Sequence, residues 1–309
     1  MGFLAILLAL LIEQARPLAY DNPVHAGLRS WTRTVRRNLD AGETPQGWVA
    51  WLLAALFPAV VAAGVHLALM QISVLLAFVW VIGVLYVTLG FRQFSHHFSE
   101  IRRALEEGDD DIARQKLATW LRVEPTSLPR AELLRQVIEH SVLAAHRHVF
   151  GVLICFLVFW VAGLGPAGAV LYRMAEYLSR NWRARPDGTP SAALQQAAAQ
   201  AWRWIDHWPA RFTGMGFAIV GNFEEAVASW RGDAERFAVG SDGVVLAATS
   251  GAINVRLMPL PEGAPPPEDG DPASRPDPQL AHLGSVVGLV WRSVVLWMLL
   301  LALLTLARI

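Results

Sequence analysis

The sequence is short of charge and nearly lacks cysteine. Only 17% of its 309 residues are charged, the basic and acidic side chains balance at 26 each, and 54% of the residues are hydrophobic. A net charge of zero gives no reason to expect nucleic acid as a partner. The single cysteine, Cys155, lies in an apolar run, which excludes an intramolecular disulfide and a cysteine-based metal site.

Charge is missing altogether between Trp48 and Phe91, a stretch of more than forty residues. A transmembrane helix needs about 20 apolar residues, so this stretch predicts a membrane hairpin over residues 47–92 with a turn near Met70 to Ser73. The flanking segments are rich in arginine, which predicts that both ends of the hairpin are cytoplasmic.

The remaining chain predicts an all-α, polytopic integral membrane protein with short or broken membrane helices and a cytosolic helical lobe. A glycine-rich break at Gly163 to Gly168 favours a re-entrant hairpin or a site, with one straight span as the alternative. Trp202, Trp204 and Trp208 suit a membrane interface. The predicted segments are a short N-terminal membrane helix with a basic loop (1–46), the transmembrane hairpin (47–92), the cytosolic helical lobe (93–147), broken membrane helices with an amphipathic segment (148–231), a flexible loop rich in proline, glycine and aspartate (232–284) and a C-terminal transmembrane helix (285–309).

No self-sufficient catalytic signature occurs. The sequence has neither a GxxxxGK[ST] phosphate loop nor a GxSxG elbow, and its histidines lack the spacing of a zinc-binding helix pair, so we predict no metal site and assign no catalytic residue. The candidate ligand-binding residues are polar side chains near the ends of apolar segments, where a role as membrane anchors is the alternative. They are Glu139, Arg147, His148, Arg173, Glu176, Arg211, Asn222 and Glu224.

Five short motifs, in order along the chain, resemble those of the CobD/CbiB family of cobalamin-biosynthesis inner-membrane proteins and its AmpE branch. Asn22 to Val24 is similar to the HPV turn of that family, and Ala104 to Asp109 to its ALEAGD helix break. The other three are Gly165 to Arg173, similar to PGALLYR; Trp208 to Phe212, similar to WIPARL; and Ser250 to Leu257, similar to AGALGVRL.

The resemblance implies one of two functions. In the synthase branch, adenosylcobinamide-phosphate synthase joins adenosylcobyric acid to an aminopropanol group through an amide, with ATP and magnesium. This chain departs from the synthase motifs, because Glu176 to Asn181 stands in place of NTLDSM and Val123 to Pro125 in place of RDT. Since acids that would hold magnesium are lost, we favour an AmpE-like regulatory or accessory membrane protein, with the synthase as the alternative.

Both hypotheses place a multi-pass protein in the bacterial inner membrane, with the lipid bilayer as a partner. A metabolite or nucleotide ligand, a protein partner and a homo-oligomer stay open, and the cofactor is unknown unless the synthase alternative brings ATP and magnesium. The regulatory hypothesis predicts a cavity lined by Arg147, His148, Arg173, Glu176 and residues 222–224. The synthase hypothesis predicts that Glu139, Glu176 and Glu224 replace the missing acids.

Overall fold

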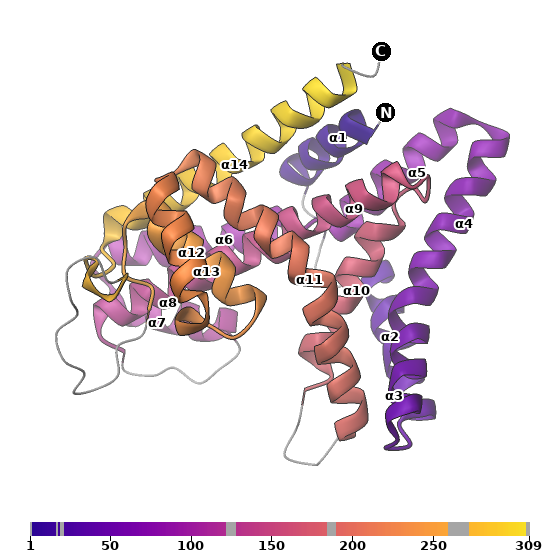
Figure 1. Ribbon diagram of the computed structural model, residues 1–309, viewed down its shortest axis with the longest axis horizontal. Helices are drawn as coiled ribbons and strands as arrows, with labels where there is room; N and C mark the ends of the chain where they lie inside the picture. Colours follow the sequence, from indigo (N-terminus) through magenta and orange to yellow (C-terminus); the bar gives the residue numbers. More distant parts are fainter. Residues whose placement is uncertain are drawn as a thin grey trace. The chain divides into compact units, whose positions relative to one another are not determined.

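The computed structural model describes residues 2–16, 18, 22–121, 128–183, 190–258 and 272–306. The fold is all-α, as predicted, and these residues contain no strand (Figure 1). Two π-helical turns, η1 and η2, and one 3₁₀ turn, η3, occur among the α-helices. The elements are α1 (Gly2–Ala15), α2 (Pro23–Leu39), α3 (Thr44–Trp51), η1 (Leu52–Leu56), α4 (Phe57–Ile72), α5 (Val74–Thr88), α6 (Phe91–Glu106), α7 (Asp110–Leu121), α8 (Arg130–Ala145), η2 (His146–Phe150), α9 (Gly151–Val161), α10 (Ala167–Asn181), α11 (Ala192–Val220), α12 (Phe223–Phe237), α13 (Ser241–Ile253), η3 (Pro272–Ser274) and α14 (Leu280–Leu306).

Three stretches of helix are long and apolar enough to cross a membrane: Thr44–Ile72, Arg130–Val161 and Leu280–Leu306. The first joins α3, η1 and α4 without a break, and the second joins α8, η2 and α9. Each exceeds the roughly 20 residues that a bilayer crossing requires. Their length and composition confirm an all-α membrane protein.

The predicted hairpin is formed by α4 and α5. Ser73 separates the two helices with extended backbone angles (φ −162°, ψ 128°), at the predicted turn. The indole nitrogen of Trp80 on α5 donates a hydrogen bond to the carbonyl oxygen of Ala62 on α4, at 3.2 Å. With 15 residues, α5 is shorter than the roughly 20 residues of a full crossing.

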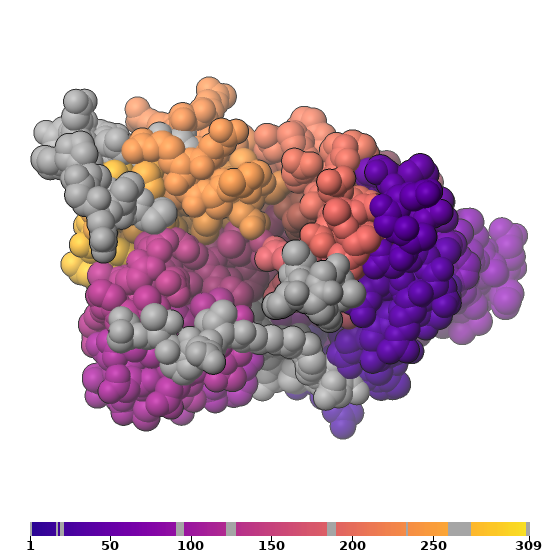
Figure 2. Space-filling view, turned by 90° about the horizontal axis from the view of Figure 1, so that it is seen from below, coloured from indigo at the N-terminus to yellow at the C-terminus, as the bar shows by residue number. Residues whose placement is uncertain are grey.

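The chain forms two compact units, and each takes two separate stretches of sequence. Unit 1 comprises residues 1–90 and 147–209. Small side chains fill much of its core, so α3, η1, α10 and α11 approach one another closely. At Gly47 the approach leaves no room for a side chain, because a Cβ there would lie 2.7 Å from the carbonyl oxygen of Ala193. Figure 2 shows the indigo N-terminal helices lying against the salmon-coloured chain of this unit. The buried core residues include Ala50, Trp51, Ala54, Ala55, Leu178, Leu194, Ala197, Ala198 and Ala201.

The predicted glycine break is present in unit 1. The helix that begins at Arg130 ends with α9 at Val161, and α10 begins at Ala167. Gly165 adopts φ +58°, in the left-handed region that favours glycine, and a Cβ there would lie 2.4 Å from the ring of His66. The break therefore requires glycine both for its backbone angle and for the approach of α4.

Unit 2 comprises residues 91–146 and 210–309, and α13 lies in its core. The sequence predicted a flexible loop over 232–284, which is wrong for Ser241–Ile253, because every residue from Gly243 to Ala252 is buried in helix α13. A Cβ on Gly251 would lie 2.3 Å from the carbonyl oxygen of Glu225, so glycine lets α12 pack against α13 at backbone distance. The loop was predicted because this helix is rich in small residues and has no polar face, so it lacks the amphipathic pattern of a surface helix.

The proline-rich part of that predicted loop, residues 261–278, lies largely outside the described residues. Its described end forms η3 and an extended segment that returns to the end of α13, where the Arg256 amide donates to the carbonyl oxygen of Pro276 at 2.9 Å. This segment is therefore fixed to the core of unit 2.

Candidate functional site

A buried glutamate held by two arginines lies on α10 in unit 1. Glu176 is 3% exposed, and its neighbours at i−3 and i+4 lie on the same helix face. Arg173 donates to its Oε2 and Arg180 to its Oε1, each at 3.1 Å. Both carboxylate oxygens of Glu176 are thus engaged by guanidinium groups.

Two further basic side chains, Arg147 and His148 on η2, act on Glu176. Burial raises the pKa of Glu176, but Arg173, His148, Arg180 and Arg147 together lower it, to about 2. Opposite charges stabilise the ionised form of a carboxyl group, and here their effect exceeds that of desolvation. Glu176 is therefore a carboxylate at neutral pH.

His148 packs against the end of α5. A Cβ on Gly90 would lie 3.1 Å from its Nδ1 atom, so the absence of a side chain at Gly90 leaves room for the imidazole. This Nδ1 atom is buried and has no hydrogen-bond partner among the described residues. A ring nitrogen without a partner is available to a ligand.

The start of α2 brings another histidine to Arg173. The Asn22 side chain caps α2 by accepting from the His25 amide at 2.9 Å, and His25 Nε2 donates to the carbonyl oxygen of Val87 at 3.0 Å. Burial lowers the pKa of His25; the hydrogen bond to Val87 opposes this, and the charge of Arg173 adds to it. The motif that resembles the family's HPV turn thus lies within electrostatic range of the motif that ends in Arg173.

We call this group the cationic cluster. Its three arginines outnumber its one glutamate, and the guanidinium group presents a rigid fork of donors that matches carboxylate and phosphate oxygens. The arrangement therefore favours an anionic ligand. The cluster consists of His25, Arg147, His148, Arg173, Glu176 and Arg180.

Immediately before Arg173 in the chain, Tyr172 forms a buried pair with an aspartate that supports α10. The Tyr172 hydroxyl donates to Oδ1 of Asp206 on α11 at 2.7 Å, and both residues are fully buried. Burial and the adjacent Asp206 carboxylate raise the pKa of Tyr172 well above its usual value, so its hydroxyl stays protonated. Sequence reasoning missed Asp206, although an acid between Trp202 and Trp208 was a usable signal.

The structure brings together four of the eight predicted site residues: Arg147, His148, Arg173 and Glu176. The other four belong to unit 2 and have local partners or positions there. Glu139 pairs with Arg135 on the same face of α8. Asn222 caps α12 by accepting from the Glu225 amide at 3.3 Å, and Glu224 is exposed in the first turn of that helix. Arg211 is half-buried on α11.

The segment that resembles AGALGVRL has a structural role in unit 2. Asn254 ends α13 in the left-handed conformation (φ 51°), and Ser250 donates to the carbonyl oxygen of Val255 at 2.6 Å. The buried Arg275 donates to Ser250 at 3.1 Å and to Ser229 at 2.7 Å, and it pairs with Glu225 at 2.9 Å. This arginine therefore links η3 to α12 and α13.

Arg275→Met should lower the free energy of unfolding by about 2–4 kcal/mol, because the substitution removes the charge partner of Glu225 and a hydrogen-bond donor to two buried serines. Arg256→Met is the matched control, since its partner Asp277 is largely exposed; its cost should stay below about 1 kcal/mol. Thermal unfolding in detergent micelles measures both. Equal effects of the two substitutions would contradict the assigned role of Arg275.

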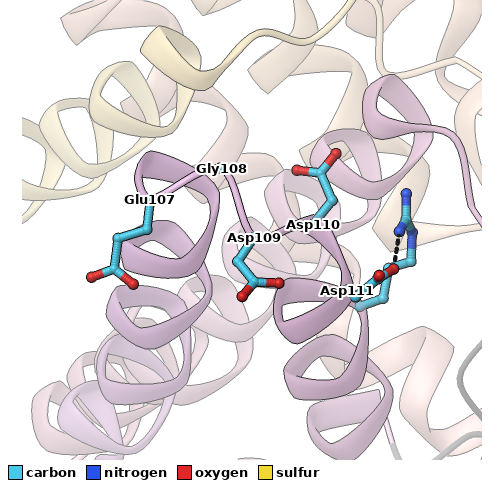
Figure 3. Close-up of a pocket in the computed structure, with 6 residues that line it drawn as sticks. Glu107, Gly108, Asp109, Asp110 and Asp111 are labelled. Carbon is cyan, nitrogen blue, oxygen red and sulfur yellow. Dashed lines mark hydrogen bonds and ion pairs between the residues drawn. The ribbon is translucent and has the colours of Figure 1, made fainter.

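An acidic hollow of about 400 Å³ lies between α6 and α7, lined by Glu107, Gly108, Asp109, Asp110, Asp111 and Arg114 (Figure 3). Asp109 accepts from the Ile112 amide at 3.3 Å and so caps α7. Asp111 pairs with Arg114 at 2.6 Å, and Asp110 pairs with Arg130 at 2.5 Å. The aspartates of this turn thus have structural partners.

Magnesium does not fit the cationic cluster. Glu176 would have to leave two arginines to bind a metal ion, and no group of three or more histidine, cysteine, aspartate or glutamate side chains within the described ranges could hold one. The arginines do fit the oxygens of a phosphate or a carboxylate. The cluster is therefore suited to an anion rather than to a divalent cation.

Known proteins resemble this chain over most of its length. A family model described as CobD/Cbib protein matches residues 3–259. The "Cobalamin biosynthesis protein CobD" of Stutzerimonas stutzeri is 28% identical over 276 residues, which cover 84% of each chain. Its namesake from Chromobacterium violaceum is 30% identical over 57% of this chain, which spans about half (54%) of that relative. No solved structure matches the chain. These relatives give no specific support to the AmpE-like branch.

Proposed function

We propose a function from one premise: this chain belongs to the CobD/CbiB family. Its relatives from Stutzerimonas and Chromobacterium are named for cobalamin biosynthesis. We infer that the chain acts in that pathway, as a multi-pass protein of the bacterial inner membrane, and that the cationic cluster binds the anionic part of its substrate. The observation that carries this proposal is the arrangement of Arg147, Arg173 and Arg180 around the single carboxylate of Glu176.

The proposed step is the amide-forming one, in which a carboxyl group of the corrinoid is activated by ATP as an acyl phosphate, with release of ADP; the amine of an aminopropanol group then attacks it, and the amide forms as phosphate leaves. Such a step places at least one anion, a carboxylate or a phosphate, next to the reacting centre. Arg173 and Arg147 would bind and orient that anion, while Glu176 holds Arg173 and Arg180 in place. The buried hydrogen bond from Tyr172 to Asp206 would hold α10, which carries Arg173, against α11.

An AmpE-like regulatory or accessory function is the second candidate. It is favoured by the pairing of both Glu176 oxygens with arginine, which leaves no carboxylate of the cluster available for magnesium. Under this candidate the same arginines bind an anionic metabolite or nucleotide without turnover. The two functions thus share the site and differ in whether a product forms.

Complementation of a strain that lacks the cobalamin-pathway synthase tests the proposal, with growth on cobyric acid as the only corrinoid source. We expect growth with the unaltered protein and at least a tenfold loss of growth yield with Arg173→Gln, because an oriented anion is lost. Arg183→Gln is the control, since Arg183 is an exposed arginine just after α10 whose side chain donates to the Ser179 carbonyl oxygen.

Membrane expression must be equal for all variants, as judged by immunoblot. Absence of growth with the unaltered, membrane-inserted protein would contradict the biosynthetic proposal and support the accessory candidate. Full growth with Arg173→Gln would show that Arg173 is not needed to bind the substrate. The assignment to cobalamin biosynthesis would still stand.

A further inference from the structure

An exposed aromatic patch lies on unit 1, away from any role assigned above. Trp204 and Trp208 are one helical turn apart on α11 and are 64% and 63% exposed. The half-buried Trp48 on α3 stacks on Trp204, with ring centroids 5.6 Å apart and planes inclined by 18°. We call Trp48, Trp204 and Trp208 the aromatic patch.

The neighbouring Trp202 does not belong to it. Its ring packs on Tyr172, with centroids 5.2 Å apart, so it faces the core of unit 1. The sequence predicted an interfacial position for Trp202, Trp204 and Trp208 together, whereas the structure separates one structural tryptophan from two outward ones. Large exposed aromatic surfaces mark interaction sites, because leaving them in water costs free energy.

The aromatic patch is continuous with a membrane-crossing helix. Trp48 lies one turn after the start of the helix Thr44–Ile72, and the exposed large side chains that follow are apolar, among them Val49, Leu53 and Phe57. Residues 48–72 span about 36 Å at 1.5 Å per residue, slightly more than the roughly 30 Å of bilayer hydrocarbon. Trp48 therefore reaches the boundary of the hydrocarbon layer, and the stacking brings Trp204 close to it.

Charge next to the patch fits lipid phosphate. Arg203 is exposed and immediately precedes Trp204. Tryptophan prefers the headgroup level of a bilayer, where its ring is apolar and its N–H group can find a polar partner, and arginine there contacts phosphate. A water-soluble partner protein would leave the apolar helix that begins beside Trp48 uncovered.

We propose that the aromatic patch inserts into the headgroup region of the phospholipid bilayer and holds the middle of α11 at that level. This inference is independent of the proposed function, since it concerns where unit 1 meets the lipid rather than what the cationic cluster binds. Tyr172, which packs on the inward-facing Trp202, then lies in unit 1 behind this interface.

Depth measurement with a single fluorophore tests the proposal. Cys155 is the sole cysteine, so Cys155→Ser gives a background in which Trp204→Cys or Trp208→Cys can be labelled with an environment-sensitive dye in nanodiscs. Val60→Cys, exposed within the crossing helix, and Val239→Cys, 91% exposed between α12 and α13, are the controls for hydrocarbon and for water. The quenchers are nitroxide lipids labelled at the headgroup or deep in the acyl chain, and aqueous iodide.

Dyes at positions 204 and 208 should be quenched at least threefold more by the headgroup nitroxide than by iodide, and the dye at 60 by the deep nitroxide. Iodide quenching at 204 and 208 equal to that at 239 would overturn the proposal. Protection from all three quenchers together with cross-linking between copies would also overturn it, in favour of a dimer interface. Using two exposed positions on one helix keeps the test valid if one variant fails to fold.

Discussion

Glu176→Gln should lower the free energy of unfolding by about 3–5 kcal/mol, because it removes the negative charge from a buried group of basic side chains while keeping the shape of the side chain. Arg173 and Arg180 each lose their ion-pair partner, and Arg147 loses a neighbouring counter-charge. Thermal unfolding in detergent micelles at pH 7 measures the loss.

The pH dependence of the unfolding free energy provides a second measure of the stability that the Glu176 charge contributes. The pKa of Glu176 is lowered from 4.5 to about 2, so its contribution to stability is fully present above pH 4.5 and is lost as the pH falls from 4.5 towards 2. A shift of this size corresponds to about 3 kcal/mol. Glu176→Gln should remove this part of the acid dependence, and unchanged acid dependence in the variant would contradict the assigned charge state.

Glu106→Gln is the matched control. Glu106 pairs with Arg102 at 2.7 Å on the exposed surface of α6, with side chains 47% and 42% exposed. Exposed pairs of this kind contribute about 0–1 kcal/mol, so this variant should be nearly neutral. A loss comparable to that of Glu176→Gln would mean that burial of the cationic cluster is not the cause.

Gly151→Ala should strongly destabilise unit 1. A Cβ on Gly151 would lie 2.0 Å from the Tyr172 hydroxyl oxygen, a distance that real atoms do not tolerate. Tyr172 must then move away from Asp206, which breaks a fully buried hydrogen bond to a carboxylate. Overpacking and the lost hydrogen bond together should cost about 3–5 kcal/mol.

The control for this substitution is Gly83→Ala on α5. A Cβ on Gly83 would meet no heavy atom within 4 Å, so the substitution should be neutral or stabilise the helix by up to about 1 kcal/mol. Both variants are compared by their unfolding midpoints in the same detergent. A neutral Gly151→Ala would show that the approach of Tyr172 to α9 is not as close as described.

Much of the fold could be read from the sequence because the signals were local. The charge-free stretch predicted two helices with a turn near Ser73, where α4 and α5 meet. The glycine-rich run predicted the break between α9 and α10. Helix α13 could not be predicted, because small residues buried on every side produce no amphipathic period. Its helical form depends on the approach of α12, which only the tertiary structure supplies.

The proximity of the residues in the cationic cluster could be predicted only in part, for a similar reason. Arg173 and Glu176 share a helix face, so their pairing follows from spacing alone. His25 and Asp206 were missed, because their partners are 62 and 34 residues away in the chain and no local pattern links them. The predicted AmpE-like function rested on lost acids, whereas the relatives found here carry the name of the biosynthetic branch.

Direct detection of the amide product tests the central claim most sharply. The purified protein in nanodiscs is incubated with adenosylcobyric acid, the aminopropanol substrate, ATP and magnesium, and the corrinoids are resolved by mass spectrometry. We predict the amide product with the unaltered protein and with Arg183→Gln, and at least a tenfold lower yield with Arg173→Gln. Absence of product from the folded, unaltered protein, alongside product from a relative of the same family, would contradict a biosynthetic function for this chain.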